Sequence, residues 1–111
     1  IENLKRSFNF WNNYLIKNTI CIIGASHKGI SFSQIFLKNK IPINFYIFDG
    51  SQDKIGKFHP DHNCKILAQK DIDYSKHNKF MLSIDQKWHK KFKESINSNY
   101  AEFYDFEGRK I

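Results

Sequence analysis

Apolar residues near the start of the chain recur at helical spacing and then give way to a continuous apolar run. In the segment 2–16 the separations are four, three and four positions, formed by Leu4, Phe8, Trp11 and Leu15. This spacing puts the four side chains on one face of a helix. The run ICIIGA at 20–25 is rich in β-branched residues and is typical of a strand with both sheet faces covered. We therefore expect an amphipathic helix followed by a strand of a parallel sheet.

Helix and strand signals continue to alternate after this run. The turn GASHKG at 24–29 precedes apolar positions that suit a helix to about Asn39. Pro42 then introduces the run INFYIFDG, a second strand that ends in Asp49. This order is a βαβ unit, whose crossover is right-handed almost without exception. Its ligand site is expected at the carboxyl ends of the strands.

The second half of the chain completes a pattern of five strands. Residues 51–63 are polar and aperiodic and are expected to form a long loop. Beyond it we expect short strands at 64–68 and 79–84, a basic helix at 85–96 and a final strand at 100–106. The buried side of that helix is predicted to consist of Trp88, Phe92 and Ile96. The predicted fold class is α/β, a small Rossmann-like three-layer sandwich with a mainly parallel sheet of about five strands.

The length of 111 residues fits a single domain. Hydrophobic residues make up 41% of the chain and aromatic residues 16%, which is enough for a packed core. The sequence begins at Ile1 rather than Met, so we expect a fragment of a longer protein. Cys21 lies in an apolar run and Cys64 in a polar segment, so no disulfide is expected.

The net charge of +7 comes almost entirely from lysine, because only Arg6 and Arg109 of the 18 basic residues are arginines. Bidentate recognition of bases and phosphates favours arginine, so the charge argues against a nucleic-acid partner and leaves small anionic ligands favoured. No apolar run approaches the ~20 residues of a membrane span, and the start shows no signal-peptide pattern. We expect a cytoplasmic domain without a membrane partner.

The turn GASHKG is the first candidate site. Gly24 is expected where the backbone turns sharply after the strand, and Gly29 where the helix packs closely or a ligand approaches the backbone. Between them, the amides of Ser26, His27 and Lys28 can point at an anion, helped by the helix dipole. Ser26 is also a candidate helix cap. A strand-to-helix turn without a ligand explains the same residues, and both hypotheses stay open.

Asp49 is the second candidate. It ends the second strand 25 residues after Gly24, where dinucleotide-binding proteins place an acidic residue on a ribose hydroxyl. The alternative is a turn-initiating Asp ahead of Gly50, since Asp-Gly is a common turn dipeptide.

No metal site or catalytic constellation is recognisable. His59, His62 and Cys64 lie close together in HPDHNC, but no second cluster completes a four-ligand zinc site. His27 is the best placed histidine for proton transfer, although no nucleophile and base occur at a recognisable spacing. The residues alone therefore nominate no general acid or base.

Two motifs in this order resemble those of the C-terminal Rossmann-like domain of bacterial S-adenosylmethionine-dependent C-methyltransferases that act on nucleotide-linked deoxysugars. In that family a GA-x-x-KG turn follows a leading helix, and a D…K-x-GK-x-x-P-G segment, whose last position is Asp61 here, precedes an apolar strand. The matching positions here are Gly24, Ala25, Lys28, Gly29, Asp49, Lys54, Gly56, Lys57 and Pro60. The resemblance spans residues 8 to about 92.

The resemblance implies a non-catalytic domain that binds a nucleotide-sugar substrate beside a methyltransferase domain located elsewhere, in cis or in trans. It implies no cofactor on this domain, with S-adenosylmethionine serving a parent protein of deoxysugar or polysaccharide biosynthesis. Lys28, Lys54 and Lys57 would then neutralise a diphosphate, with Asp49 accepting a sugar hydroxyl. Pro60 would belong to the same substrate-binding segment.

Two other functions stay open. A stand-alone domain that binds NAD(P) or another nucleotide fits the same βαβ unit, although the turn lacks one of the three glycines of the dinucleotide fingerprint. A structural or protein-interaction module fits the high aromatic content, and its exposed contacts would be Tyr46, Trp88 and Tyr104.

Overall fold

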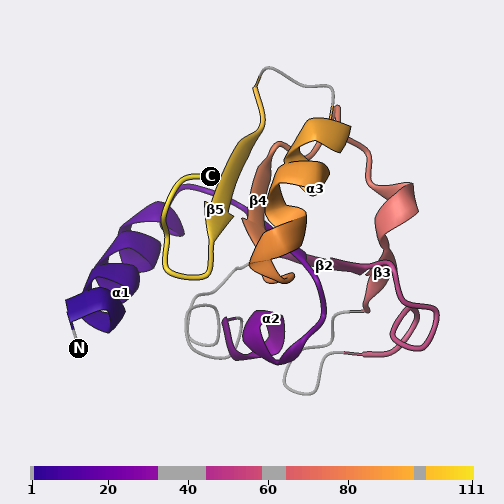
Figure 1. The fold of residues 1–111 in the computed structure, drawn as a ribbon, viewed down its shortest axis with the longest axis horizontal. Helices are drawn as coiled ribbons and strands as arrows, with labels where there is room; N and C mark the ends of the chain where they lie inside the picture. Colours follow the sequence, from indigo (N-terminus) through magenta and orange to yellow (C-terminus); the bar gives the residue numbers. More distant parts are fainter. Residues whose placement is uncertain (1, 33–44, 59–64, 97–99) are drawn as a thin grey trace.

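The chain forms a five-stranded sheet with helices on both sides (Figure 1). The computed structural model describes residues 2–32, 45–58, 65–96 and 100–111. Along the chain the helices and strands are α1 (Glu2–Tyr14), β1 (Cys21–Ile23), α2 (His27–Phe32), β2 (Tyr46–Asp49), β3 (Leu67–Ala68), the 3₁₀ turn η2 (Gln69–Asp71), β4 (Lys79–Leu82), the 3₁₀ turn η3 (Gln86–Trp88), α3 (His89–Ser95) and β5 (Glu102–Asp105).

The sheet has the strand order β3-β2-β1-β4-β5, and all four strand pairs in the described residues are parallel. β1 lies at the centre, where its Ile22 pairs with Ile47 of β2 on one side and Met81 of β4 on the other. The chain runs outward from β1 to β2 and β3 and then returns to β4 and β5. The strand order therefore reverses between β1 and β4. This topology confirms the predicted Rossmann-like α/β fold.

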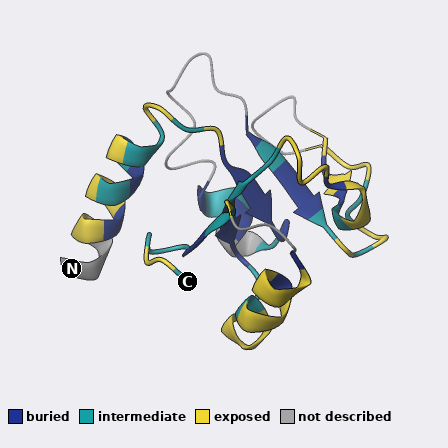
Figure 2. Ribbon diagram, turned by 90° about the horizontal axis from the view of Figure 1, so that it is seen from above, coloured by how far each residue is buried: buried dark blue, intermediate teal, exposed yellow. Residues whose placement is uncertain are grey.

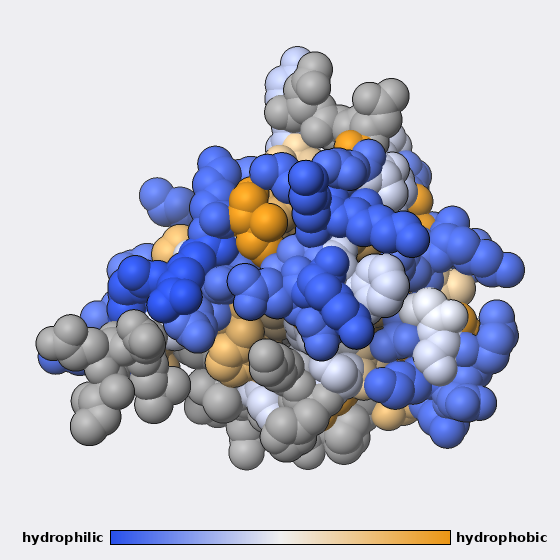
Figure 3. Space-filling model, in the orientation of Figure 1, coloured by the Kyte–Doolittle hydropathy of each residue, from blue (hydrophilic) through white to orange (hydrophobic). Residues whose placement is uncertain are grey.

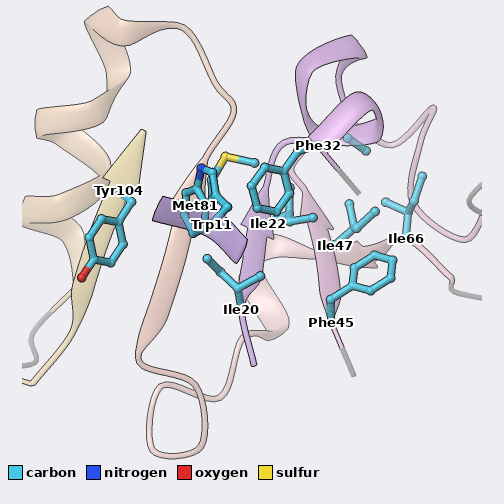
Figure 4. Close-up of a cluster of buried hydrophobic side chains, with 10 residues drawn as sticks. Trp11, Ile20, Ile22, Phe32, Phe45, Ile47, Ile66, Met81 and Tyr104 are labelled. Atoms are coloured by element: carbon cyan, nitrogen blue, oxygen red, sulfur yellow. The ribbon is translucent and has the colours of Figure 1, made fainter. Parts of the chain in front are cut away.

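Alternate residues of each strand enter two different cores. The core on one face is closed by Trp11 of α1 and Phe32 of α2 (Figure 4). Its strand members are Ile22, Ile47, Met81 and Tyr104. The core on the other face is closed by Phe92 of α3. Its strand members are Cys21, Ile23, Phe48, Phe80, Leu82 and Phe103. Both sheet faces are thus buried between helices whose outer sides are exposed (Figure 2), which explains why the strands are continuous apolar runs.

Helix α1 is confirmed, but its inward face differs from the expected one. Trp11 is completely buried, and its indole N–H donates to the Phe106 carbonyl at 2.8 Å. The buried Ser7 hydroxyl donates to the same carbonyl at 3.3 Å. Phe8, which we expected on this face, is 48% exposed. Because the side chains of Ser7 and Trp11 both donate to the Phe106 carbonyl, these two residues face the core. Phe8 then lies at the edge of the buried face of the helix.

Two expectations about aromatic residues are wrong. Trp88 is 48% exposed, whereas Phe92 and Ile96 are buried as predicted. The Asp85 carboxylate caps the 3₁₀ turn η3, so Trp88 precedes α3 and is not part of its buried stripe. Tyr104, expected as an exposed contact, is buried, because β5 is covered on both faces. The surface that carries α3 is mostly hydrophilic (Figure 3).

The polar loop after β2 is described as far as residue 58. The Gly56 N–H donates to the Ile66 carbonyl, and the Ile66 N–H donates to the Lys57 carbonyl, both at 2.8 Å. These bonds hold the loop against the segment that enters β3. The predicted helix beyond Phe32 lies outside the described residues, as do His59, His62 and Cys64. Within the described ranges, no helix has the length and apolar character needed to cross a membrane.

Candidate functional site

The GASHKG turn leaves the carboxyl end of β1 through Gly24. The φ angle of Gly24 is +102°, a conformation that favours glycine. Its N–H donates to the Phe48 carbonyl of β2 at 2.7 Å. On the opposite side, the Ser83 hydroxyl shares its proton between the carbonyl oxygens of Ile23 at 2.8 Å and Gly24 at 2.5 Å. The turn is therefore fixed to the ends of both neighbouring strands.

Gly29 is required because α2 packs directly on the end of β1. A Cβ atom at this position would collide with the Gly24 carbonyl oxygen and lie only 2.8 Å from the Ser83 hydroxyl oxygen. Gly24 and Gly29 thus occupy the first and last positions of a G-x-G-x-x-G turn, with the roles of tight turn and close helix packing. The glycine that is missing is the middle one, where Ser26 stands.

The backbone of Ser26 begins the helix. Its carbonyl accepts the N–H of Ile30 at 3.0 Å, the first bond of the helical turn. Its hydroxyl donates to the Ser83 carbonyl at 3.2 Å. This bond directs the hydroxyl toward the end of β4. The hydroxyl oxygen keeps its lone pairs for accepting a hydrogen bond, so its role as a helix cap stays a prediction.

Asp49 connects the ends of β2 and β1. Its Oδ2 accepts the N–H of Ala25 at 2.7 Å, and its Oδ1 accepts the N–H of Ser51 at 2.7 Å. The bond to Ser51 is the local turn predicted as the alternative role, and the bond to Ala25 brings the carboxylate to the GASHKG turn. Each carboxylate oxygen can accept a second hydrogen bond. Asp49 is only partly buried, so a ligand can reach it.

The roles of the other predicted site residues stay predictions. Lys54 and Lys57 lie on the loop after β2, where the Lys54 N–H donates to the Ser51 carbonyl at 3.1 Å and the Lys57 carbonyl accepts the Ile66 N–H at 2.8 Å. The backbones of His27 and Lys28 form the first turn of α2, but their side chains lie outside the described part of the structure. Pro60 also lies outside the described residues.

Sequence analysis missed Ser83, which is 5% exposed and contacts both glycines of the turn region. It is the first polar residue after the apolar strand at 79–82, and that change of character is the signal that marks it. Its contacts with Ile23 and Gly24 span 60 and 59 positions of sequence. Only the pairing of β1 with β4 brings these residues together.

A cavity of about 690 Å³ lies at the carboxyl ends of β4 and β5, on the same sheet edge as the turn. Its lining mixes charges of both signs and includes His89, Lys93, Asp105, Glu107 and Arg109. Arg109 pairs with Glu107 at 3.0 Å, and His89 Nε2 lies 3.0 Å from the Ile84 carbonyl. The cavity lies beside the strand that carries the turn, because β4 adjoins β1.

No known family model matches the chain, and no curated protein matches it. Several solved structures are similar, including two dehydrogenases. One is aspartate semialdehyde dehydrogenase II from Vibrio cholerae in complex with ASA, with a TM-score of 0.62 and 14% identity over 78% of this chain and 27% of that one. The other is UDP-D-quinovosamine 4-dehydrogenase from Vibrio fischeri, with a TM-score of 0.59 and 19% identity over 80% of this chain and 77% of that one.

These likenesses describe the fold. The chain spans about a quarter of the length of the Vibrio cholerae enzyme. Both of these structures are dehydrogenases by name, and neither is a methyltransferase. The resemblance to the sugar C-methyltransferase domain therefore stays a prediction from sequence motifs.

Proposed function

We propose that this domain binds a dinucleotide of the NAD class across the carboxyl ends of β1 and β2. The observation on which the proposal depends is the hydrogen bond from Ala25 N–H to the Asp49 carboxylate. It puts the acidic group at the end of β2 next to a turn built on Gly24 and Gly29. In dinucleotide-binding folds these two features hold the ribose and the diphosphate, respectively.

Strand topology supports the same location. The strand order reverses between β1 and β4, and ligands of open α/β sheets bind outside the carboxyl ends of the strands at such a point. The cavity beside β4 and β5 lies on this edge and would receive the part of the ligand beyond the diphosphate. The names of the two similar structures fit this assignment, because hydride transfer is commonly performed by nicotinamide nucleotides.

The chain's own residues have defined tasks in this proposal. Gly24 and Gly29 shape the turn so that a diphosphate can approach its backbone. The Asp49 carboxylate accepts a hydrogen bond from a ribose hydroxyl with its remaining lone pairs and keeps its hydrogen bond to the Ala25 N–H. Ser26 directs its hydroxyl away toward Ser83, which partly replaces the missing middle glycine.

Calorimetric titration with NAD and NADP tests the proposal. A carboxylate on the ribose disfavours a 2′-phosphate, so NAD should bind at least about tenfold more tightly than NADP. Asp49→Asn removes the negative charge and should reduce this preference, whereas Asp53→Asn, a change of equal charge on the exposed loop, should leave it intact. Equal affinities of the original protein for both nucleotides would contradict the ribose role of Asp49.

A nucleotide-sugar is the second candidate ligand. It is favoured by the motifs shared with sugar C-methyltransferases and by the name of the Vibrio fischeri protein, which this chain covers over 77% of its length. In this alternative the domain is non-catalytic and a separate S-adenosylmethionine-binding domain transfers the methyl group. UDP-glucose in the same titration separates the two, since a nucleotide-sugar domain should bind it more tightly than NAD.

A further inference from the structure

A second cavity lies at the amino-terminal edge of the sheet, opposite the GASHKG turn. It encloses about 580 Å³, and small-molecule sites occupy roughly 300–1,000 Å³. Its wall includes the first residues of three strands, Cys21 of β1, Tyr46 of β2 and Lys79 of β4. The turn at Gly24 begins three residues after Cys21, about 10 Å along the strand. The two sites therefore use opposite ends of the same strands.

Positive charge gathers around this second cavity. Three lysines line it, namely Lys17, Lys76 and Lys79. Two carboxylates oppose them, with Glu102 at 3.6 Å from the Lys79 ammonium group and Asp73 at 4.0 Å from that of Lys76. Lys17 pairs with no carboxylate of the described residues. The lining therefore has an excess of cationic groups over carboxylates.

The two ion pairs differ in how firmly they hold the lysines. The side chains of Lys76 and Asp73 are 77% and 50% exposed, and such pairs contribute only about 0–1 kcal/mol. Lys76 can therefore leave Asp73 for an anionic ligand at little cost. The side chain of Lys79 is 27% exposed, and its ammonium group pairs with Glu102 and donates to the side-chain amide oxygen (Oδ1) of Asn78 at 3.4 Å. It provides a positioned charge at the cavity wall.

Aromatic and polar groups complete the lining. The ring centroid of His77 lies 4.5 Å from that of Tyr46, and the two ring planes are inclined to each other by 59°. Asn18, Thr19 and Asn78 add polar groups, although the Asn18 amide already donates to the Tyr14 carbonyl at 2.8 Å. The Cys21 thiol is 2% exposed, and burial raises its pKa to about 12, so it stays neutral and does not repel an anion.

We propose that this cavity binds a small phosphorylated molecule. Its phosphate would lie among Lys17, Lys76 and Lys79, and its ring or chain would pack against Tyr46 and His77. Lysine ammonium groups bind phosphate as point charges, and the rings of Tyr46 and His77 offer aromatic surface to the rest of the ligand. This site does not depend on the proposed nucleotide site, because the two share no residue.

Titration of isotope-labelled protein with phenyl phosphate and with inorganic phosphate, followed by amide chemical shifts at constant ionic strength, tests the proposal. We expect saturable shifts at residues 17–21 and 76–79, with phenyl phosphate binding more tightly because its ring contacts the aromatic wall. Amides at 24–29 and 49–51 should not move. Shifts that do not saturate, or that are spread over all lysine-rich segments, would overturn the proposal.

A pair of matched double variants separates a built site from general charge attraction. Lys17→Ala with Lys76→Ala removes two exposed ammonium groups at the cavity and should weaken phenyl phosphate binding about tenfold or more. Lys5→Ala with Lys70→Ala removes two exposed lysines elsewhere and should leave the affinity unchanged. Equal losses in the two double variants would also overturn the proposal. Titration with NAD tests the proposed site at the carboxyl-terminal edge of the sheet. A negative result at one site therefore leaves the proposal for the other site unaffected.

Discussion

Gly24 and Gly29 are both required in the turn after β1, but for different reasons. Gly24 has a positive φ angle, whereas Gly29 leaves room for the carbonyl of Gly24 and the hydroxyl of Ser83. A glycine elsewhere in the same region has neither constraint. At Gly50 a Cβ atom would meet nothing within 4 Å.

Gly29→Ala should lower the free energy of unfolding by about 1–3 kcal/mol through overpacking against a backbone atom. Gly50→Ala is the matched control and should change it by no more than about 0.5 kcal/mol. Urea denaturation of the two variants measures the difference. Equal stability of the two variants would show that α2 does not pack on β1 as described.

The Asp49 carboxylate has a structural task besides the proposed ligand contact. It accepts two backbone N–H groups, those of Ala25 and Ser51. Asp49→Asn replaces one accepting oxygen by an NH₂ donor that faces a backbone donor, and should lower the free energy of unfolding by about 1–3 kcal/mol. Asp53→Asn, on the exposed loop, should leave it nearly unchanged in the same urea denaturation. Similar losses in both variants would refute the bridging role.

At the scale of elements, the strands were predictable and the rotation of the helices was not. β1, β2 and β4 are continuous apolar runs because both sheet faces are buried, and that signal is local. The inward face of α1 depends on the Phe106 carbonyl, which lies 95 positions beyond Trp11. The position of Trp88 depends on the cap made by Asp85. The spacing of apolar residues along the chain reveals neither of these two contacts.

The candidate site shows the same division between local and distant information. Gly24, Gly29 and Asp49 were found from spacing, because a βαβ unit places them at fixed points of the chain. Ser83 was missed, since it reaches the turn only through the pairing of β1 and β4. The fold could be predicted from the sequence, whereas the contacts that join non-consecutive strands could not.

The two tryptophans should differ in solvent access. Trp11 is fully buried, whereas Trp88 is 48% exposed, with the ammonium groups of Lys87 and Lys91 at 5.6 and 5.4 Å from its ring centroid. In Trp11→Phe the remaining fluorescence should be quenched readily by iodide, which the lysines attract. In Trp88→Phe it should resist quenching. Equal quenching in the two variants would contradict the arrangement of α1 and α3.

At the scale of the whole molecule, stability should depend on pH through the buried Cys21 thiol. Burial raises its pKa to about 12, whereas a thiol in an unfolded chain ionises near pH 8.5. Between these values the unfolded chain loses a proton that the folded protein keeps, so rising pH favours unfolding. The thiol's contribution to stability is fully present below about pH 8.5 and declines above it.

This pH effect can be isolated with Cys21→Ala. At pH 7 the variant should be less stable, because the core loses a buried sulfur atom. The difference from the original protein should shrink by about 1.4 kcal/mol for each pH unit above 8.5. Urea denaturation from pH 7 to pH 10 measures it. A difference that stays constant with pH would mean that the thiol is not buried in the folded protein.

The central claim is that the carboxyl edge formed by β1 and β2 binds a nucleotide, and an amide chemical-shift titration with NADH and UDP-N-acetylglucosamine tests it most directly. We predict saturable shifts confined to residues 24–29, residues 49–51 and the start of the segment after β4. The ligand that produces them at the lower concentration is the closer match to the physiological one. The absence of shifts at these residues with both ligands would contradict the claim and make the GASHKG turn a purely structural feature.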